Sequence, residues 1–251
     1  MSRHTAPISE VFSSLAGEGP QVGRRQLFLR TAGCHLDCSY CDTFTDPAEP
    51  CRFERLPGSG RLVEVANPLD LEAVFAMLTE LEGVYPGHVH LAVTGGEPLL
   101  HAEFLLELLP RVKDELGLAV HLEYSGTLPE ELRRVIDLCD VVACDIKPAS
   151  LCGRDVTGVT RRSLELCVAV GVELVPKVIF GRESDFAEVE AGVRMVAGIA
   201  PDAPVILQPV HGPGGLPDLS GPELLETLIR ASRLHPDVRL IPQVHKLLAV
   251  R

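Results

Sequence analysis

Six short apolar stretches, each followed by a segment of helical periodicity, restrict the fold of this chain more than any other feature. They are rich in Val, Ile and Leu and cover residues 25–30, 89–94, 118–124, 141–146, 172–180 and 203–210. Nearly continuous apolar character is typical of strands buried on both faces of a parallel sheet. Six strand–helix repeats predict an α/β fold with right-handed crossovers, built on a barrel-like or an open parallel sheet.

Candidate helices lie between these stretches, at 68–82, 101–116, 128–138, 160–170, 184–199 and 220–235. Several have start signals, namely Asn67-Pro68, Thr127 with Pro129, and Ser184 with Glu188. Residues 46–67 are rich in Pro and Gly and depart from this rhythm, which indicates an insertion. We expect a single domain over residues 1–251.

Composition excludes several classes of protein. Apolar residues make up 46% and charged residues 23% of the 251 residues, which is typical of a globular protein with a substantial core. The net charge of −12 disfavours a nucleic-acid partner, because an acidic surface repels phosphates. No apolar run approaches the ~20 residues of a membrane span, and the N-terminus lacks a signal-peptide segment, so we expect a cytoplasmic protein with no membrane partner.

Polar or glycine-rich groups follow all six predicted strands. They are a cysteine loop, TGGEP (94–98), EYSGT (123–127), DIKP (145–148), Lys177 and QPVHGPGG (208–215). In parallel α/β folds, ligands bind at the carboxyl ends of the strands. We therefore expect these groups to share one rim of the sheet.

The cysteine loop contains Cys34, Cys38 and Cys41 with the spacing Cys-x3-Cys-x2-Cys. Thiolates are the usual ligands of iron–sulfur clusters, and four is their usual number. Three cysteines can hold three irons of a [4Fe–4S] cube and leave the fourth iron open. A structural zinc site is an alternative, with Cys51 or His35 as fourth ligand. The remaining cysteines are expected to fill the core, and a second cluster is the alternative.

This spacing, with Tyr40 before the last cysteine and TGGEP about fifty residues later, resembles the radical S-adenosylmethionine superfamily. The resemblance implies a partial (β/α)6 TIM-like barrel, a [4Fe–4S] cluster and S-adenosylmethionine, which an electron from the cluster cleaves to a 5′-deoxyadenosyl radical. It places the S-adenosylmethionine contacts at Tyr40, Asp42, Gly95, Gly96, Glu97, Ser125, Asp145, Lys147 and Gln208. Ser125 and Gln208 could instead be turn and strand-end residues.

Further motifs narrow the resemblance. The opening ISEVFSSLAGEGPQVGRRQLFLRTAGC (8–34), the CDT at 41–43, EYSGT, and Pro-Gln-x-His-Lys at 242–246 are similar to the 7-carboxy-7-deazaguanine synthase family. This similarity implies conversion of 6-carboxy-5,6,7,8-tetrahydropterin to 7-carboxy-7-deazaguanine with loss of ammonia, a step of queuosine and 7-deazapurine biosynthesis. It also implies catalytic use of S-adenosylmethionine, Mg²⁺, a homodimer and a reducing electron-transfer protein.

The same resemblance assigns further site residues. Mg²⁺ falls to Thr43, and the pterin substrate falls to Leu15, Ala16, Gly17, Glu18, Arg30, Thr94, His245 and Arg251. The C-terminal tail is expected to close the substrate pocket. Thr43 could instead cap a turn, Arg30 could form a strand-end ion pair, and His245 could be structural.

Two positions depart from the family pattern. Ala16 stands where the family usually has Gln, and DIKP replaces Ser-Pro-Lys-Pro in a form similar to glycyl-radical activating enzymes. Two other functions therefore compete with the synthase. One is a radical activating enzyme that acts on a protein partner, and the other is a non-catalytic iron–sulfur or zinc protein.

Overall fold

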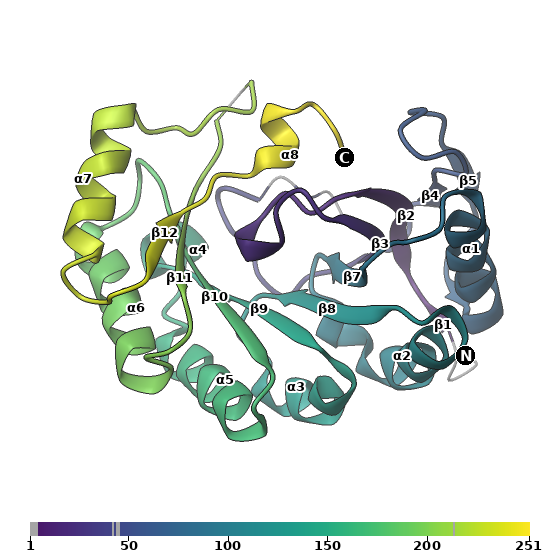
Figure 1. The fold of residues 1–251 in the computed structure, drawn as a ribbon, viewed down its shortest axis with the longest axis horizontal. Coiled ribbons are helices and arrows are strands. Elements are labelled where there is room, and N and C mark those ends of the chain that lie inside the picture. The colour runs from purple at the N-terminus through teal and green to yellow at the C-terminus, as the bar shows by residue number, and fades with distance from the viewer. Residues whose placement is uncertain (1–4, 42, 44–45, 213) are drawn as a thin grey trace.

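The computed structural model describes residues 5–41, 43, 46–212 and 214–251. All six predicted strands are present and pair in parallel in chain order: β3 (Arg25–Thr31), β7 (His90–Gly95), β8 (Ala119–Tyr124), β9 (Val141–Ile146), β10 (Glu173–Phe180) and β11 (Val205–Pro209). The six predicted helices follow them: α1 (Leu71–Val84), α2 (Ala102–Leu116), α3 (Pro129–Val135), α5 (Thr157–Val170), α6 (Phe186–Ile199) and α7 (Gly221–Ala231). These helices cover the outer face of a curved sheet (Figure 1). The predicted partial (β/α)6 barrel is confirmed.

Further strands extend this sheet at both ends. β12 (Val238–Leu240) pairs in parallel with β11 at one end. At the other end β2 (Ile8–Leu15) lies antiparallel to β3, and β4 (Cys51–Phe53) and β5 (Val63–Val65) follow it. The Pro- and Gly-rich segment 46–67 thus supplies the last two strands at this end, of which β5 is the edge strand. A separate pair joins β1 (Thr5–Ala6) to β6 (Leu69–Asp70). The short helices are η1 (Gly19–Gln21), η2 (Pro98–His101), η3 (Ile136–Leu138), α4 (Ala149–Cys152) and α8 (Val244–Leu247).

Two helices begin later than the sequence signals suggest, because the capping side chain is a different one. α1 begins after Asp70, whose Oδ1 accepts a 2.8 Å hydrogen bond from the amide of Ala73. The Asn67 side chain instead bonds both backbone groups of Ile8 and so ties the chain to β2. Asp185, rather than Ser184, caps α6.

The two faces of the sheet differ in character. Leu, Val and Phe side chains fill the space between the sheet and the outer helices. The inner face carries buried polar groups. Among them, Gln26 Nε2 lies 3.3 Å from Nδ1 of His90 and 3.4 Å from Nδ1 of His121. Burial lowers the pKa of His121 to about 4, so this ring is neutral near pH 7. The polar interior continues to the carboxyl ends of the strands, where the pocket opens.

The C-terminal segment lies across the gap between the two ends of the curved sheet (Figure 1). The amide of Val244 donates a 2.8 Å hydrogen bond to the carbonyl of Gly17. The hydroxyl of Ser14 donates a 2.6 Å hydrogen bond to the backbone oxygen of Arg251. These contacts bring the tail onto the turn after β2, although more than 200 residues separate the two segments in the chain.

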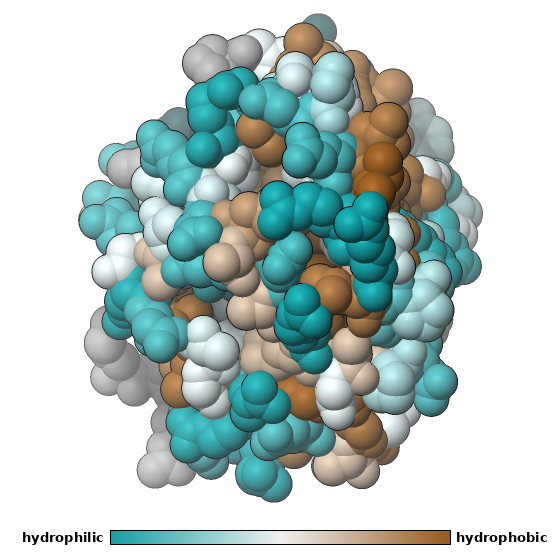
Figure 2. Space-filling view, turned by 90° about the vertical axis from the view of Figure 1, so that its left-hand side faces the viewer, coloured by the Kyte–Doolittle hydropathy of each residue, from teal (hydrophilic) through white to brown (hydrophobic). Residues whose placement is uncertain are grey.

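The outer face of α7 exposes apolar side chains. Leu225 is 57% and Ile229 is 49% exposed. Figure 2 views this side of the molecule and shows apolar side chains among hydrophilic ones. Among the residues that the structure describes, no helix combines the length and apolar character that crossing a bilayer would require.

Candidate active site

The motifs at the six strand ends open into one cavity of about 480 Å³, within the size range of small-molecule sites. Most of the candidate residues line it: Leu15, Gly17, Glu18, Arg30, Cys34, Cys38, Tyr40, Cys41, Thr43, Thr94, Gly95, Gly96, Ser125, Asp145, Lys147, Gln208, His245 and Arg251. Ala16 and Glu97 are buried outside this lining. Asp42 lies outside the described residues. The predicted rim therefore gathers residues from all six strand ends in a single space.

The cysteine loop follows β3 and is anchored to neighbouring segments by backbone hydrogen bonds. The amide of Glu97 donates a 2.8 Å hydrogen bond to the carbonyl of Gly33, and the amide of Ser39 donates a 3.0 Å bond to the carbonyl of Leu151 in α4. Cys34, Cys38 and Cys41 are free thiols that are exposed or half-buried in the cavity, whereas the other five cysteines are buried. The three sulfurs of the loop therefore face one space, and the other cysteines of the chain do not reach it.

The glycine motif after β7 is held by close backbone contacts. Gly95 has φ +140°, and a Cβ at this position would lie 2.3 Å from the carbonyl oxygen of Thr31. Glu97 accepts hydrogen bonds of 3.0 Å from the amides of both Leu99 and Ser125. Its carboxylate therefore joins the TGGEP turn to the end of β8 and does not face the cavity. Glu97 therefore positions the motif from the side that faces away from the cavity.

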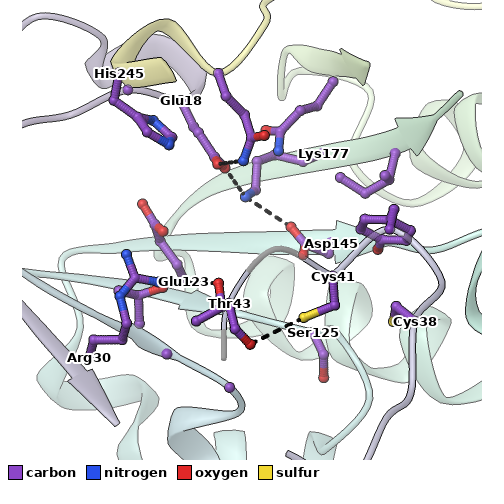
Figure 3. A pocket seen from close by; sticks show the side chains of 18 of the residues that line it. Glu18, Arg30, Cys38, Cys41, Thr43, Glu123, Ser125, Asp145, Lys177 and His245 are labelled. Carbon is purple, nitrogen blue, oxygen red and sulfur yellow. Dashed lines mark hydrogen bonds and ion pairs between the residues drawn. The ribbon is translucent and has the colours of Figure 1, made fainter. Parts of the chain in front are cut away.

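Paired charges line the cavity next to the cysteine loop. Lys147 Nζ lies 2.7 Å from Asp145 Oδ2 and 3.0 Å from the Tyr40 hydroxyl. Lys177 Nζ lies 2.9 Å from Asp145 Oδ1 and 2.7 Å from Glu18 Oε2. Burial opposes ionisation of Asp145, but Lys147 and Lys177 outweigh it and hold the pKa of Asp145 below its usual range. Figure 3 shows Lys177 between Asp145 and Glu18.

The Gly17-Glu18 turn meets the C-terminal tail on the opposite side of the cavity. Gln243 Nε2 donates a 2.7 Å hydrogen bond to Glu18 Oε1. A Cβ on Gly17 would lie 2.0 Å from Nδ1 of His245, so glycine is required for the histidine to pack there. Burial would raise the pKa of Glu18, but Lys177 and Gln243 hold it well below its usual range. The Glu18 carboxylate is therefore ionised.

Arg30 lies at the third side of the cavity, where β3 ends beside the start of β2. Its Nε lies 3.1 Å from Glu10 Oε2, and its Nη1 donates to Thr43 Oγ1 at 3.4 Å. Next to it, Phe12 and Phe28 stack with ring centroids 4.9 Å apart. Ala16 is buried at the opposite end of this strand pair, in the turn between β2 and β3, where its amide donates to the carbonyl of Arg24 and its carbonyl accepts from the amide of Gly23.

Several cavity residues were missed by the sequence reasoning about the site. They are Glu10, Phe12, Phe28, Arg52, Glu123, Lys177, His211, Gln243 and Lys246. Lys177 was marked at a strand end without a role, and Glu123 begins the EYSGT motif. Burial raises the pKa of Glu123, and the neighbouring Glu18 and Asp145 add to the effect. A strand alternation argument could have found Glu10 and Phe12, because alternate residues of β2 share one face.

The lining fits the cofactors of a radical S-adenosylmethionine protein. Three thiols face one space, and Gly95 and Gly96 line the same space with their backbone. Gln208 Oε1 is buried at the cavity with no hydrogen-bond partner among the described residues, so it is a free acceptor. In the part of the chain that the structure describes, no three His, Cys, Asp or Glu side chains are gathered as ligands of a single ion. Thiols that bind different irons of a cube need not meet at one point.

The fold and the cysteine loop define the class of radical S-adenosylmethionine proteins, and the model of the radical SAM superfamily matches residues 28–150. The 7-carboxy-7-deazaguanine synthase of Geobacter sulfurreducens is 38% identical over 98% of both chains. The synthase of Methanothermobacter thermautotrophicus is 33% identical, also over 98% of both. The chain belongs to the 7-carboxy-7-deazaguanine synthase family.

A solved structure supports the fold independently. The crystal structure of QueE from Escherichia coli has a TM-score of 0.59 to this chain and covers 96% of it, with 95% of that chain matched. Its sequence identity is 23%, so this likeness concerns the architecture alone.

Proposed function

We propose that this protein is a radical S-adenosylmethionine lyase that converts 6-carboxy-5,6,7,8-tetrahydropterin to 7-carboxy-7-deazaguanine and ammonia. The observation that carries the proposal is a single cavity in which the three-cysteine loop faces the Gly17-Glu18 turn, in a chain of this family. The substrate differs from the product by one ammonia, so the reaction needs no net oxidant or reductant. Substrate and cofactor must share a space, and one cavity of this size provides it.

The residues near the cysteine loop would hold the cofactors. Cys34, Cys38 and Cys41 would bind a [4Fe–4S] cluster, which with S-adenosylmethionine supplies the radical that removes a hydrogen atom from the substrate. Gly95 and Gly96 line the cavity with backbone alone, which would allow a methionyl group to approach. Seven further groups were assigned to S-adenosylmethionine: Tyr40, Asp42, Glu97, Ser125, Asp145, Lys147 and Gln208. Of these, Glu97 acts by positioning, since its carboxylate is bonded to two amides.

The residues on the opposite side would hold the pterin. Ionised Glu18 is an acceptor for the amino and ring N–H groups of a pterin, and Lys177 and Gln243 fix its orientation. Arg30 is a donor for the substrate carboxylate. His245 and Arg251 bring the tail over the same space, as a pocket for a small molecule requires. Gly17 is part of the site because it allows His245 to approach.

The test is direct. The protein, reconstituted without air, is incubated with a reductant, S-adenosylmethionine and the tetrahydropterin, and the products are followed by mass. We expect a product lighter than the substrate by one ammonia, with ammonia formed in equal amount. A reconstituted cluster that yields 5′-deoxyadenosine but no deazapurine would contradict the proposal and favour a radical enzyme with another substrate.

An activating enzyme for a protein partner is not favoured. A polypeptide would need an open groove along the sheet. Here the tail bonds to Gly17 and Ser14 across the gap between the sheet ends. The DIKP motif lies beside the cysteine loop, since Lys147 pairs with Asp145 and contacts Tyr40, and this supports a role for it on the cofactor side.

Magnesium belongs to the proposal through Thr43. Its hydroxyl lies beside Arg30 at the cavity, where a substrate carboxylate and waters can complete the ligands of a hard cation. We expect Thr43→Ala to reduce the stimulation of turnover by Mg²⁺ by about tenfold, because one oxygen ligand is lost. Turnover measured against Mg²⁺ concentration checks this. The cluster absorbance should not change, and a wild-type metal response in the variant would remove Thr43 from the site.

The partners remain proposals as well. A reducing electron-transfer protein would supply the electron to the cluster. A homodimer is proposed from the family, and the exposed Leu225 and Ile229 of α7 are apolar surface that such an association can bury. We propose a cytoplasmic location, a single domain, and a tail that closes the substrate pocket.

A further inference from the structure

A row of side chains crosses the cavity wall on neighbouring strands. The strand registers place Thr94 beside Arg30, Arg30 beside Glu10, and Glu10 beside Arg52. Directly paired residues of neighbouring strands point to the same face of a sheet, and all four side chains line the cavity. Arg52 belongs to β4, so the segment 46–67 reaches the site through this one residue of its first strand.

Positive charge exceeds negative charge at this wall. The single carboxylate of Glu10 is shared by three guanidinium groups: Arg52 Nη2 at 2.8 Å, Arg251 Nη1 at 3.0 Å and Arg30 Nε at 3.1 Å. Glu10 is only 8% exposed, and it neutralises one of the three cations. Three guanidinium groups therefore face the cavity around one buried carboxylate. Such a wall attracts a carboxylate, because guanidinium groups have more donors than one carboxylate can use.

The stacked Phe12 and Phe28 lie next to this row. The guanidinium carbons of Arg30 and Arg251 lie 5.9 Å and 5.6 Å from the centroid of the Phe12 ring. An apolar aromatic surface beside several guanidinium groups suits a ring system that carries a carboxylate. The Glu18 side of the cavity is occupied by carboxylates and lysines in pairs, so it lacks this excess of positive charge.

We propose that Arg52, supplied by the segment 46–67, is a specificity-determining residue that binds the carboxylate of the substrate together with Arg30. This inference rests on the proposed function and gives the inserted strand a role in that site. Glu10 holds the guanidinium groups in place in the free protein, and the substrate carboxylate takes up donors that Glu10 leaves free. The segment thereby selects a carboxylated pterin over one without that group.

The test compares two aromatic ligands that cannot be turned over, 6-carboxypterin and pterin, by equilibrium dialysis against the reconstituted full-length protein. We expect the wild type to bind 6-carboxypterin at least tenfold more tightly than pterin. Arg52→Gln should weaken 6-carboxypterin by about tenfold, as expected for a lost charge-assisted hydrogen bond, and change pterin less than twofold. Arg52→Lys should fall between the two, because it keeps the charge and loses the planar fork.

Arg55→Gln is the matched control. Arg55 lies three residues further along the same segment, pairs with Glu80 at 3.2 Å and does not line the cavity. It should leave both affinities at the wild-type value. The inference is overturned if Arg52→Gln binds 6-carboxypterin as the wild type does, or if it weakens both ligands equally. A wild type without preference for the carboxylated ligand would overturn the proposed substrate itself, which separates the two failures.

Discussion

Cys38→Ala should abolish the formation of 5′-deoxyadenosine, with a loss of at least about a thousandfold in rate. Cys38 is the middle cysteine of the loop and is half-buried in the cavity beside Cys34 and Cys41. With two thiols left, a cube would have two irons without protein ligands, and cluster-forming sites depend on their cysteine ligands. The measurements are iron and sulfide content, visible absorbance, and chromatography of the nucleoside after anaerobic reduction.

Cys152→Ala is the control for this prediction. Cys152 ends α4, the turn whose carbonyl at Leu151 anchors the cysteine loop through Ser39. It is buried, and its thiol donates to the backbone oxygen of Arg154 at 3.0 Å. We expect this variant to keep its iron and its cleavage activity within about threefold. A Cys38→Ala protein that keeps a full cluster and cleaves S-adenosylmethionine would refute the ligand assignment.

Lys177→Met should destabilise the protein by about 3–5 kcal/mol, the usual effect of removing one partner from a buried ion pair. The Lys177 side chain is only 5% exposed and bridges Glu18 and Asp145 at 2.7 and 2.9 Å. Without it, two buried carboxylates face each other, although Gln243 and Lys147 still contact them. Urea denaturation measures the free energy of unfolding. Lys113→Met is the control: its pair with Asp140 is exposed to solvent, so we expect less than about 1 kcal/mol.

The pH dependence of this difference has a definite sign. In the wild type the pKa of Glu18 is lowered, so the pair contributes stability above the unfolded-state pKa of about 4.3 and loses it as the pH falls further. In Lys177→Met burial dominates and raises this pKa, so the variant loses stability as the pH rises. The difference in the free energy of unfolding between the wild type and Lys177→Met should therefore be largest near neutral pH and become smaller below about pH 4. An equal difference at pH 4 and pH 7 would contradict this electrostatic account.

Local sequence patterns predicted most of the fold. The apolar stretches predicted β3 and β7–β11 to within a few residues, because a strand buried on both faces has an apolar signal of its own. β2 was not predicted as a strand, because polar and apolar residues are mixed on both of its faces. Glu10 and Phe12 line the cavity, whereas Val11 packs in the core and Ser13 bonds His88 on the other face. The strands β4 and β5 are three residues each, too short for a period to appear.

The candidate site also has features that the sequence predicted and features that only the structure shows. The cysteine spacing, the glycine turn and the family resemblance indicated a cluster, S-adenosylmethionine and a pterin without any structure. The pairing of Lys177 with Glu18 and Asp145, and of Arg52 with Glu10, connects residues that are far apart in sequence. The sequence motif identified Glu97 as a site residue. Only the bonds of its carboxylate to the amides of Leu99 and Ser125 show that it holds the turn in place and does not face the cavity.

By itself the sequence determined the strand–helix order, the three-cysteine loop and the membership of a chemical class, because each of these depends on spacing within a short segment. The tertiary structure alone decided which charges meet, how the tail reaches Gly17, and that the segment 46–67 brings an arginine to the cavity wall. The physical reason is that ion pairs and hydrogen bonds act over a few ångströms. Strand register sets such distances, and register is a property of the assembled sheet.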